Sequence, residues 1–417
     1  MAAFAGLDVG TTSSKAVIYG SDGAVLGSGR AATTWDVGPS GTQIDAEALC
    51  AGAFDALSKA ADAAGVAVQA VGVTSMGESG VLTDAHERPL VPVVAWHDGR
   101  DGAEVADLDA AIGADAFGGI AGKPLRGQFS LTKHRWLLRH EPDANHATTR
   151  FDVGGWVVRR LGGDVVLELS LAGRTGWLDV AARDWWDDAL EWSGATRGLM
   201  PPLVAAGTPV GVVTSASVSP LLRGAVLTLA GHDHQASALG ARATGQGHEL
   251  DSSGTAEALV RTVAPVPQRA DIARLADAGI TTDPSIEADH WSLLGGTEGG
   301  LAQLRTLERL GADVATLDAA AELSPGSGPG AQWRDVVTMA ADEALALHRA
   351  MDDVVGPAVR VVVTGGWRHS SEVMRAKRSR FGPLEVSTVE EAGTLGAATL
   401  AARACGAIGA GDHLGQP

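Results

Sequence analysis

Two turns in this sequence combine glycine with small hydroxyl residues shortly after an aspartate. The first lies at 8–13 (DVGTTS) and the second at 251–257 (DSSGTAE). Glycine lets the backbone approach an anion, while amides and hydroxyls can donate hydrogen bonds to phosphate oxygens. The groups of the first turn that could contact an anion are Gly10, Thr11, Thr12, Ser13 and Lys15. Asp8 cannot bind phosphate itself, but a Mg²⁺ ion or its waters could bridge the two.

The first turn lies between two segments that have the composition of β-strands. Ala3–Val9 and Lys15–Tyr19 are short, apolar and rich in β-branched residues, and Asp22 with Gly23 supplies the turn to a third strand at Ala24–Thr34. A P-loop, in contrast, joins a strand to a helix and has the pattern GxxxxGK[ST], which this sequence lacks. An ordinary hairpin turn explains the string as well as a phosphate site does.

Asp233 follows an apolar strand-like segment and precedes a helical one. A carboxylate at a strand end near a helix N-terminus is well placed to accept a proton from a substrate hydroxyl. Helix capping is the alternative, because Asp is a favoured N-cap residue, and position alone favours the cap. His232 and His234 flank the aspartate, but no cysteine partner or third ligand accompanies them, which favours structural histidines over a metal site.

Two loops in the first half contain candidate residues for binding a small molecule. Glu78 is the one carboxylate of the small-residue loop 74–82 and could accept hydrogen bonds from polyol hydroxyls, although a solvated surface glutamate is commoner. Trp96 and Asp98 stand close to Arg100 in AWHDGRD. A structural ion pair between Asp98 and Arg100 explains that segment as well as catalysis does.

Gly365 and Gly366 end a strongly apolar strand and precede a helix. They could let a flat base lie against the backbone, and a plain strand-to-helix turn explains them equally well. The remaining pattern predicts a helix at 45–64, a strand at 70–74, mainly helices over 103–203, a loop at 322–333, a helix at 337–351 and a small-residue helix at the end of the chain. The two similar turns suggest a chain built in two halves.

The composition limits the possible partners. The chain has 417 residues, 45% of them hydrophobic, which suggests two or three domains. Fifty acidic residues against 32 basic ones give a net charge of −18, which argues against nucleic acid or an anionic membrane as partner. Cys50 and Cys405 form neither a metal-site spacing nor a disulfide framework. With no leader-like or membrane-spanning pattern, we expect a soluble cytoplasmic protein.

The order of these landmarks resembles that of the FGGY carbohydrate kinases, members of the actin/hexokinase/Hsp70-like ATPase superfamily. The shared landmarks are DVGTT, W-x-D-x-R near residue 100, GHDHQASALGA, SSGTAE and TGG before a small-residue helix. The resemblance implies an α/β fold of two actin-like (ribonuclease H-like) domains, each a mixed sheet flanked by helices, with an interdomain cleft. The expected domains are 1–224, with the first phosphate turn and the sugar side, and 225–417, with the base, the second phosphate turn and the adenosine motif.

The resemblance also assigns a reaction and the residues for it. It implies Mg²⁺-dependent transfer of the ATP γ-phosphoryl group to a hydroxyl of a sugar or polyol, without nucleic-acid or membrane partners, and it allows a homodimer. Asp233 is the implied catalytic base, Asp8 lies near magnesium, and Glu78, Trp96 and Asp98 join Asp233 on the sugar side. The implied ATP-binding residues are Gly10, Thr11, Thr12, Ser13, Lys15, Gly254, Thr255, Gly365 and Gly366.

The sequence departs from the family pattern around the acceptor. The loop at 74–80 contains SMGESG, whereas xylulose kinases usually have SGQMHG. Glu78 is similar to the glutamate with which glycerol kinases bind substrate hydroxyls, but Gly77 stands where those enzymes have arginine, and His97 replaces the asparagine of W-N-D. A pentulose such as xylulose is the first expected acceptor, because the catalytic and C-terminal motifs are most similar to that branch. Glycerol, erythritol or another polyol is the second, and an actin-like ATPase without a sugar substrate is the alternative from another class.

Overall fold

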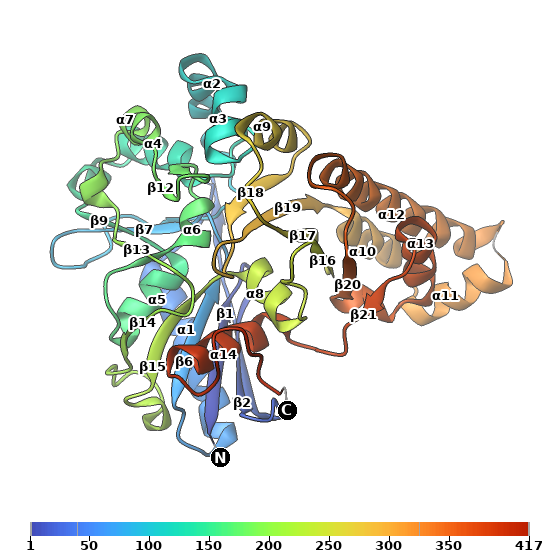
Figure 1. The fold of residues 1–417 in the computed structure, drawn as a ribbon, viewed down its shortest axis with the longest axis horizontal. Helices are drawn as coiled ribbons and strands as arrows, with labels where there is room; N and C mark the ends of the chain where they lie inside the picture. Colours follow the sequence, from blue (N-terminus) through green and yellow to red (C-terminus); the bar gives the residue numbers. More distant parts are fainter. Residues whose placement is uncertain (1, 40, 325, 416–417) are drawn as a thin grey trace.

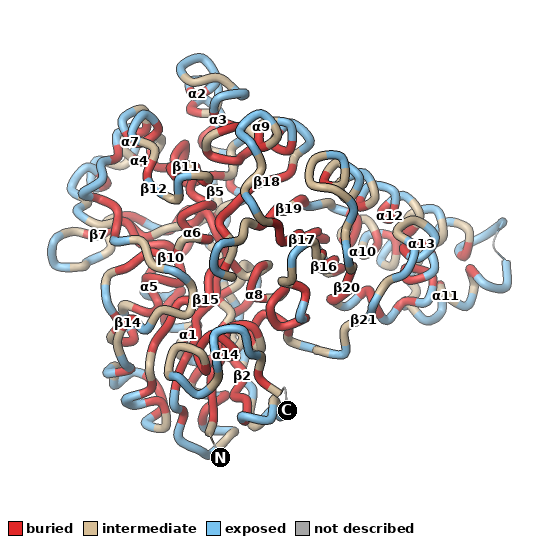
Figure 2. The backbone as a smooth tube through the Cα atoms, in the orientation of Figure 1, coloured by how far each residue is buried: buried red, intermediate tan, exposed pale blue. Residues whose placement is uncertain are grey.

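Two six-stranded β-sheets form the framework of the protein in the computed structural model, which describes residues 2–39, 41–324 and 326–415. In Figure 1 the first sheet stands in the lower left part and the second extends towards the right, with helices outside and between them. The central strands of both sheets are buried, as the tube in Figure 2 makes visible.

The first sheet has the strand order β14-β15-β6-β1-β2-β3. Its strands are β1 (Ala3–Val9), β2 (Ser13–Gly20), β3 (Val25–Ala32), β6 (Ala70–Ser75), β14 (Pro209–Val212) and β15 (Val226–His232). β1, β2 and β3 pair antiparallel in succession, whereas β6 is parallel to β1 and β15 is parallel to β6. The strands expected in the first 74 residues are thereby confirmed, with ends that differ by a few residues.

The second sheet has the strand order β18-β19-β17-β16-β20-β21. Its strands are β16 (His248–Ser253), β17 (Glu257–Val263), β18 (Thr281–Pro284), β19 (Trp291–Thr297), β20 (Arg360–Thr364) and β21 (Glu385–Val386). β19, β17 and β16 pair antiparallel, and β20 and β21 continue in parallel. This repeats the directions of β3-β2-β1-β6-β15, so the turns after Asp8 and Asp251 are equivalent hairpin turns of two related halves.

β1 is buried on both faces, and the alternation of its side chains decides where Asp8 points. Leu7 and Val9 join the core formed with α1 (Ala46–Ala64) and α5 (Val153–Leu161). Phe4 joins the opposite core, which includes α14 (Ala392–Ala404). Because successive side chains of a strand point to opposite faces, Asp8 shares the face of Phe4 and lies towards α14 at the carboxyl end of β1.

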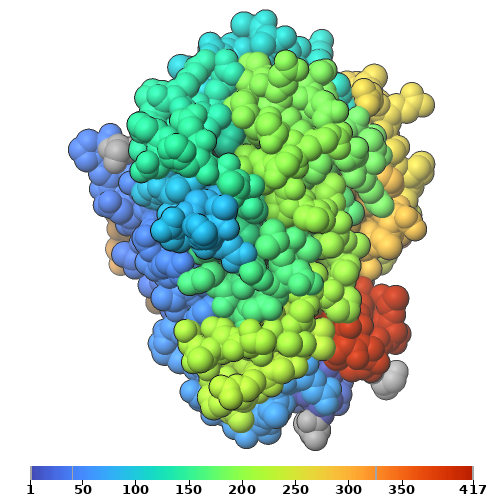
Figure 3. All heavy atoms as spheres, turned by 90° about the vertical axis from the view of Figure 1, so that its left-hand side faces the viewer, coloured from blue at the N-terminus to red at the C-terminus, as the bar shows by residue number. Residues whose placement is uncertain are grey.

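Two helices of small residues join the sheets. α14 lies so close to β1 that a Cβ added at Gly6 would overlap the carbonyl of Thr394. α8 (Asp233–Gly240) packs against α14, and Ala238 and Ala392 belong to one core with Leu250 of the second sheet. In Figure 3 the C-terminal segment, in red, lies beside the surface of the first half. The end of the chain therefore completes the core around its beginning.

The other elements surround this framework. In the first half they are β4 (Asp36–Gly38), β5 (Gly41–Ile44), β7 (Gly80–Thr83), β8 (Val93–Val94), α2 (Gly102–Ala111), α3 (Ala114–Ala121), α4 (Ser130–His140), η1 (Pro142–His146), β9 (Thr149–Asp152), β10 (Leu167–Glu168), α6 (Leu169–Gly173), β11 (Leu178–Asp179), β12 (Asp184–Trp185), α7 (Asp187–Ser193), η2 (Arg197–Leu199), β13 (Leu203–Val204) and η3 (Pro220–Leu222). In the second half they are α9 (Arg269–Asp277), α10 (Gly299–Leu310), α11 (Val314–Leu323), α12 (Gly328–Val355), η4 (Gly366–His369) and α13 (Ser371–Phe381). In the described parts of the chain, no helix has both the length and the apolar character needed to cross a membrane.

The prediction of a loop at 322–333 is wrong for most of that range. α11 continues to Leu323 and α12 already begins at Gly328, so the helix expected at 337–351 is longer at both ends. Pro329 stands in the first turn of α12, where its missing N–H would have no intrahelical partner. Position 325 of the expected loop lies outside the described residues.

The division of the chain at residue 224 stays a prediction. β15 begins at Val226 but pairs with β6 of the first sheet, and α14 packs on β1 although it lies near the end of the chain. The topology therefore favours a first unit that extends beyond residue 224 and includes α14.

Replacing Gly6 by alanine should destabilise the contact between β1 and α14. The added Cβ would overlap a backbone carbonyl, and overpacking of this kind costs about 1–3 kcal/mol. Urea unfolding of Gly6→Ala should show this loss, whereas Gly38→Ala, where a Cβ meets nothing within 4 Å, should retain the parent stability. Equal stability of the two variants would contradict the packing described for α14.

Candidate active site

Asp233 is the first residue of α8, at the end of β15. His232 occupies the N-cap position, so capping does not explain the aspartate. Oδ1 of Asp233 accepts a hydrogen bond of 2.7 Å from the N–H of His234 and lies 3.3 Å from Nε2 of His232. About a quarter of the Asp233 side chain is exposed, which leaves the carboxylate accessible to a ligand.

Asp8 and Asp233 lie within electrostatic reach of each other. Burial, together with the charge of Asp233, raises the pKa of Asp8 to about 7, and the charge of Lys15 opposes the shift. Burial also raises the pKa of Asp233 to about 7, opposed by the His234 N–H and by Arg174 and assisted by the charge of Glu78. The structure therefore brings Asp8, Asp233 and Glu78 together, and a carboxyl group with a pKa near neutrality suits proton transfer at neutral pH.

Asp8 has an unsatisfied oxygen that a cation would suit. Its Oδ1 is buried and has no hydrogen-bond partner among the described residues, and a buried polar atom left unpaired is costly. Magnesium usually takes one or two carboxylates together with phosphate oxygens and waters. Within the described parts of the chain, no group of three or more His, Cys, Asp or Glu side chains could hold a metal ion by itself. Asp8 together with nucleotide phosphates thus fits magnesium better than an all-protein site would.

The first turn is held by two indole N–H groups. Nε1 of Trp96 donates to Oγ1 of Thr11 at 2.9 Å, and Nε1 of Trp35 donates to the carbonyl of Thr11 at 2.7 Å. The side chain of Thr12 is exposed, which leaves its hydroxyl open to a ligand. Trp96 therefore contacts the first turn, and its contact with a sugar stays a prediction.

The other predicted residues of the first turn already have partners. The N–H of Gly10 donates to the carbonyl of Ser13 at 3.2 Å, and the Ser13 hydroxyl accepts from Nε of Arg30 at 3.1 Å. Nζ of Lys15 lies 3.0 Å from Oε2 of Glu391, which immediately precedes α14. A ligand at this turn would have Thr12 and backbone amides to bind, with Lys15 at its edge.

Asp98 forms the ion pair with Arg100 that the sequence analysis gave as the alternative to a ligand contact. Oδ1 accepts from Nε of Arg100 at 2.8 Å, and Oδ2 accepts from the amide of Thr42 at 2.5 Å. Burial opposes the shift, but these hydrogen bonds together lower the pKa of Asp98 to about 2. Its contact with a substrate stays a prediction.

The second turn adjoins the segment that follows β20. Gly365 has a φ of 84°, and a Cβ there would overlap the carbonyl of Ser253. It would also lie 3.0 Å from the amide nitrogen of Gly254. Gly366 begins η4 with open space beside it, and Thr255 is exposed. The four residues predicted to bind ATP in the second half therefore form one neighbourhood.

No hydrogen bond or ion pair between described residues joins the first turn to the second. The two halves are connected elsewhere, for example by Nζ of Lys123 and Oδ1 of Asp283, 2.8 Å apart. The use of both turns on a single nucleotide stays a prediction.

Lys377 of α13 supports the second turn and was missed by the sequence analysis. Its Nζ lies 2.5 Å from Oδ2 of Asp251 and also bonds Glu257, so that it joins the two strands on either side of the turn. All three side chains are buried. α13 contains several basic residues, and nothing in the local sequence distinguishes the buried one.

Arg174, directly after α6, is a second residue that the sequence analysis missed. Its Nε and Nη2 donate to Oε1 of Glu78 at 3.0 and 2.5 Å. Its Nη1 donates to Oγ1 of Thr281 at 2.6 Å and to Oδ2 of Asp283 at 3.1 Å, both on β18. The buried guanidinium therefore joins Glu78 of the first half to the edge strand of the second.

Glu168 fixes the residue before Asp233 through a chain of hydrogen bonds. Its Oε2 accepts from the amides of Ser170 and Leu171 and from the Ser170 hydroxyl, at 2.8, 3.0 and 2.6 Å. The Ser170 hydroxyl in turn accepts from the N–H of His232 at 3.0 Å. α6 is thereby tied to the end of β15, one residue before the candidate base.

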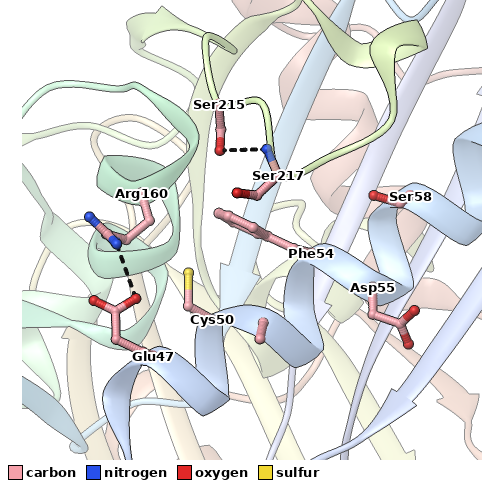
Figure 4. A pocket seen from close by; sticks show the side chains of 9 residues that line it. Glu47, Cys50, Phe54, Asp55, Ser58, Arg160, Ser215 and Ser217 are labelled. Carbon is pink, nitrogen blue, oxygen red and sulfur yellow. Dashed lines mark hydrogen bonds and ion pairs between the residues drawn. The ribbon is translucent and has the colours of Figure 1, made fainter.

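A cavity of about 540 Å³ opens elsewhere on the first half, between α1, α5 and the segment at 215–217 (Figure 4). Arg160 and Glu47 form an ion pair of 3.1 Å at its side. Cys50 lines it, but burial raises the pKa of the thiol to about 12, so the sulfur is protonated and not nucleophilic at neutral pH. None of the predicted site residues lines this cavity.

Comparison with known proteins identifies the family. A model of the N-terminal domain of the FGGY family of carbohydrate kinases matches residues 3–240. The chain therefore belongs to the FGGY family of carbohydrate kinases. The matched range extends beyond residue 224 and includes β15 and α8.

Individual relatives differ in the substrates that their names give. L-fuculokinase of Escherichia coli K12 is 30% identical over 196 residues, which are 46% of this chain and 41% of that enzyme. Xylulose kinase of Streptomyces coelicolor is 29% identical over 281 residues, 66% of this chain and 57% of that enzyme. The chain thus matches about half the length of these curated relatives.

The solved structures share the whole fold. Glycerol kinase of Plasmodium falciparum, solved with ADP, superposes with a TM-score of 0.90 at 17% identity and covers 99% of this chain and 91% of its own. The expected α/β fold of two actin-like domains is confirmed by this similarity together with the repeated sheet topology.

The burial of Glu168 should make the stability of the protein depend on pH. Burial raises its pKa from 4.5 to about 7, so the folded protein binds more protons than the unfolded chain between these values, and stability falls as the pH rises from 4.5 through 7. In Glu168→Gln this loss, on the order of 1–3 kcal/mol, should be absent. Urea unfolding of parent and variant at pH 5 and pH 8 measures the difference, with the exposed Glu308→Gln as control. A parent-minus-variant difference that does not change with pH would contradict the buried carboxyl.

Proposed function

We propose that this protein transfers the γ-phosphoryl group of ATP to a hydroxyl of a sugar or polyol. The observation that supports this best is that Asp233 feels the charge of Glu78 and itself acts on Asp8, and that burial raises the pKa of both aspartates to about 7. Membership of the FGGY family supports the same reaction class. The proposal gives Asp233 the role of base and Asp8 the role of magnesium ligand.

Asp233 accepts the proton of the acceptor hydroxyl. As it does so, the acceptor oxygen forms its bond to the γ-phosphorus, and the bond from that phosphorus to the bridging oxygen of ADP breaks. The transition state of such transfers is loose, so positioning and charge stabilisation contribute more than covalent chemistry. Magnesium held by Asp8 would supply neutralisation of the phosphate charge.

The two hairpin turns bind the nucleotide in this proposal. Amides and hydroxyls at 10–13 and at 254–255 hold phosphate oxygens, and the glycines at 365–366 let the adenine approach the backbone. Closure of one half on the other would exclude water and limit idle ATP hydrolysis. The exposure of Thr12 and Thr255 supports this assignment, because both hydroxyls are available to a ligand.

A pentulose such as xylulose is the first acceptor to test, and glycerol, erythritol or another polyol the second. The xylulose kinase among the relatives supports the first choice, whereas the buried Glu78 beside Asp233 supports the second. The proposal places the protein in the cytoplasm and allows a homodimer. An actin-like ATPase is the competing function, and it would release ADP at a rate independent of any sugar.

Asp233→Asn should abolish acceptor-dependent ADP formation. The amide cannot accept the hydroxyl proton, and general-base assistance contributes about 10²–10⁴ in rate. A coupled ADP assay with a panel of ketoses and polyols measures the loss, and Asp36→Asn at an exposed strand residue serves as control. Turnover of Asp233→Asn within a few-fold of the parent would exclude the base, and no stimulation of the parent by any compound would favour the competing ATPase.

Removing one hydroxyl from either turn should weaken ATP use without weakening the fold. Thr12→Val and Thr255→Val each lose one hydrogen bond to a charged phosphate, which lowers kcat/KM for ATP by about 10–100-fold. Thr12→Ser and Thr255→Ser keep the hydroxyl and should stay near the parent. Should the valine variants use ATP as well as the serine variants do, the phosphate assignment would be wrong.

A further inference from the structure

The backbone of Glu78 adopts a conformation that glutamate rarely occupies. Its φ is 64°, in the left-handed region that costs a residue with a Cβ about 1–2 kcal/mol. The Ser130 hydroxyl donates to the Glu78 carbonyl at 2.5 Å, and Nη2 of Arg150 does so at 3.4 Å. Such strain persists when the surroundings determine the conformation, and it is concentrated at ligand sites.

The two oxygens of the Glu78 carboxylate have unequal surroundings. Oε1 accepts two hydrogen bonds from Arg174 and one of 2.9 Å from Nε2 of Gln128. No described side chain or amide donates to Oε2. The carboxylate therefore has one saturated oxygen and one that is free to accept a hydroxyl from a ligand.

The guanidinium that saturates Oε1 is itself fixed from the second half. Nη1 of Arg174 bonds Thr281 and Asp283, and Oδ1 of Asp283 lies 2.8 Å from the buried Nζ of Lys123. Two carboxylates thus neutralise the charge of Arg174, which leaves it little attraction for an anionic ligand. Arg174 nevertheless lies near enough to Asp233 to lower its pKa.

Gly77 provides the space that Arg174 occupies. A Cβ at residue 77 would lie 2.9 Å from Cγ of Arg174 and 3.0 Å from its Cβ, closer than real Cβ atoms approach other atoms. The glycine before Glu78 and the arginine after α6 therefore fit each other, although 96 residues separate Glu78 from Arg174 in sequence.

We propose that Arg174 is a positioning residue for the acceptor. It holds Glu78 so that Oε2 faces the acceptor hydroxyls, and through Asp283 it makes this orientation depend on β18 of the second half. The acceptor class recognised in this way is a neutral polyhydroxy compound without a carboxylate, because the open oxygen only accepts hydrogen bonds and the guanidinium is neutralised. The inference rests on the proposed function.

The test compares steady-state constants of Arg174→Met and Arg174→Lys with those of the parent. Loss of the charged hydrogen bonds that orient Glu78 should raise KM for the acceptor by about 10–100-fold in Arg174→Met. KM for ATP should change by less than about twofold, since only the acceptor contact is removed. Arg174→Lys keeps the charge and should recover part of the acceptor affinity.

Arg183→Met is the matched control. Arg183 also connects the halves, because its Nη2 donates to the carbonyl of His290 at 2.9 Å and its guanidinium lies 4.2 Å from the Trp291 ring centroid. It has no contact with Glu78. A purely structural effect of losing an arginine between the halves would appear in both variants, whereas a positioning effect appears in Arg174→Met alone.

Gly77→Ala and Asp283→Asn provide independent variants should Arg174→Met fail to fold. Each displaces or releases Arg174 and should raise the acceptor KM in the same direction. In the double variant Gly77→Ala/Arg174→Lys, Gly77→Ala should raise the acceptor KM by a smaller factor than it does alone, because both substitutions act through the side chain at residue 174.

Four outcomes would overturn the inference. If the folded variants keep the acceptor KM of the parent, Arg174 has no positioning role, while the kinase proposal stands. If KM for ATP rises as much as KM for the acceptor, the effect is not specific to the acceptor, and the positioning role is excluded in the same way. A parent enzyme that prefers an aldonate to every neutral compound removes the acceptor class. A parent that phosphorylates no compound removes the proposed function, and this inference with it.

Discussion

The burial of Asp8 beside Asp233 is the interaction on which the arrangement of this protein depends. Burial is the largest cause that raises the pKa of each carboxyl to about 7, and the charge of Asp233 adds to the shift of Asp8. Neither is neutralised by a direct ion pair with a lysine or arginine among the described residues. Such an arrangement opposes folding at neutral pH, so it persists only because the packing around it allows no alternative. The closeness of β1, α8 and α14 supplies that packing.

Buried ionic contacts between the halves act on orientation more than on stability. Arg174 and Lys123 meet Asp283 where water is excluded, and the desolvation of such groups offsets most of their attraction. What these contacts do provide is a defined direction for each hydrogen bond. Glu78 is thereby set relative to the second sheet, so the orientation of this acceptor-side residue depends on both halves.

Local sequence patterns were sufficient for β1, β2, β3, β6, β15 and β20 and for the two hairpin turns, whereas β18 and β19 were not predicted. Apolar and β-branched residues indicated β1, and a strongly apolar run indicated β20. Both signals lie in consecutive residues, so they are visible without knowledge of the tertiary fold. α12 was predicted too short, because a Gly- and Pro-rich start resembles a loop until Pro329 is seen in a first helical turn. Glycine and threonine in similar order also revealed the relation between the halves.

The supports of the candidate site could not be predicted in this way. Arg174 and Lys377 look like ordinary basic residues of helical segments, and their partners lie 96 and 126 residues away. Trp96 donates to Thr11, a contact between segments 85 residues apart, which the local sequence did not reveal. Such pairings follow from the tertiary fold, and local patterns in a single sequence do not reveal which distant segments meet.

The position of α14 has a consequence for synthesis of the protein in the cell. The helix that covers Phe4, Val17 and Tyr19 is made long after them, since Thr394, whose hydroxyl meets that of Tyr19, follows it by 375 residues. Until then one face of the earliest sheet is without its apolar cover, and exposed surface of this kind promotes aggregation of nascent chains. Completion of the first half therefore waits for synthesis of the second, and a chain terminated before α14 would be a client for chaperones or proteases.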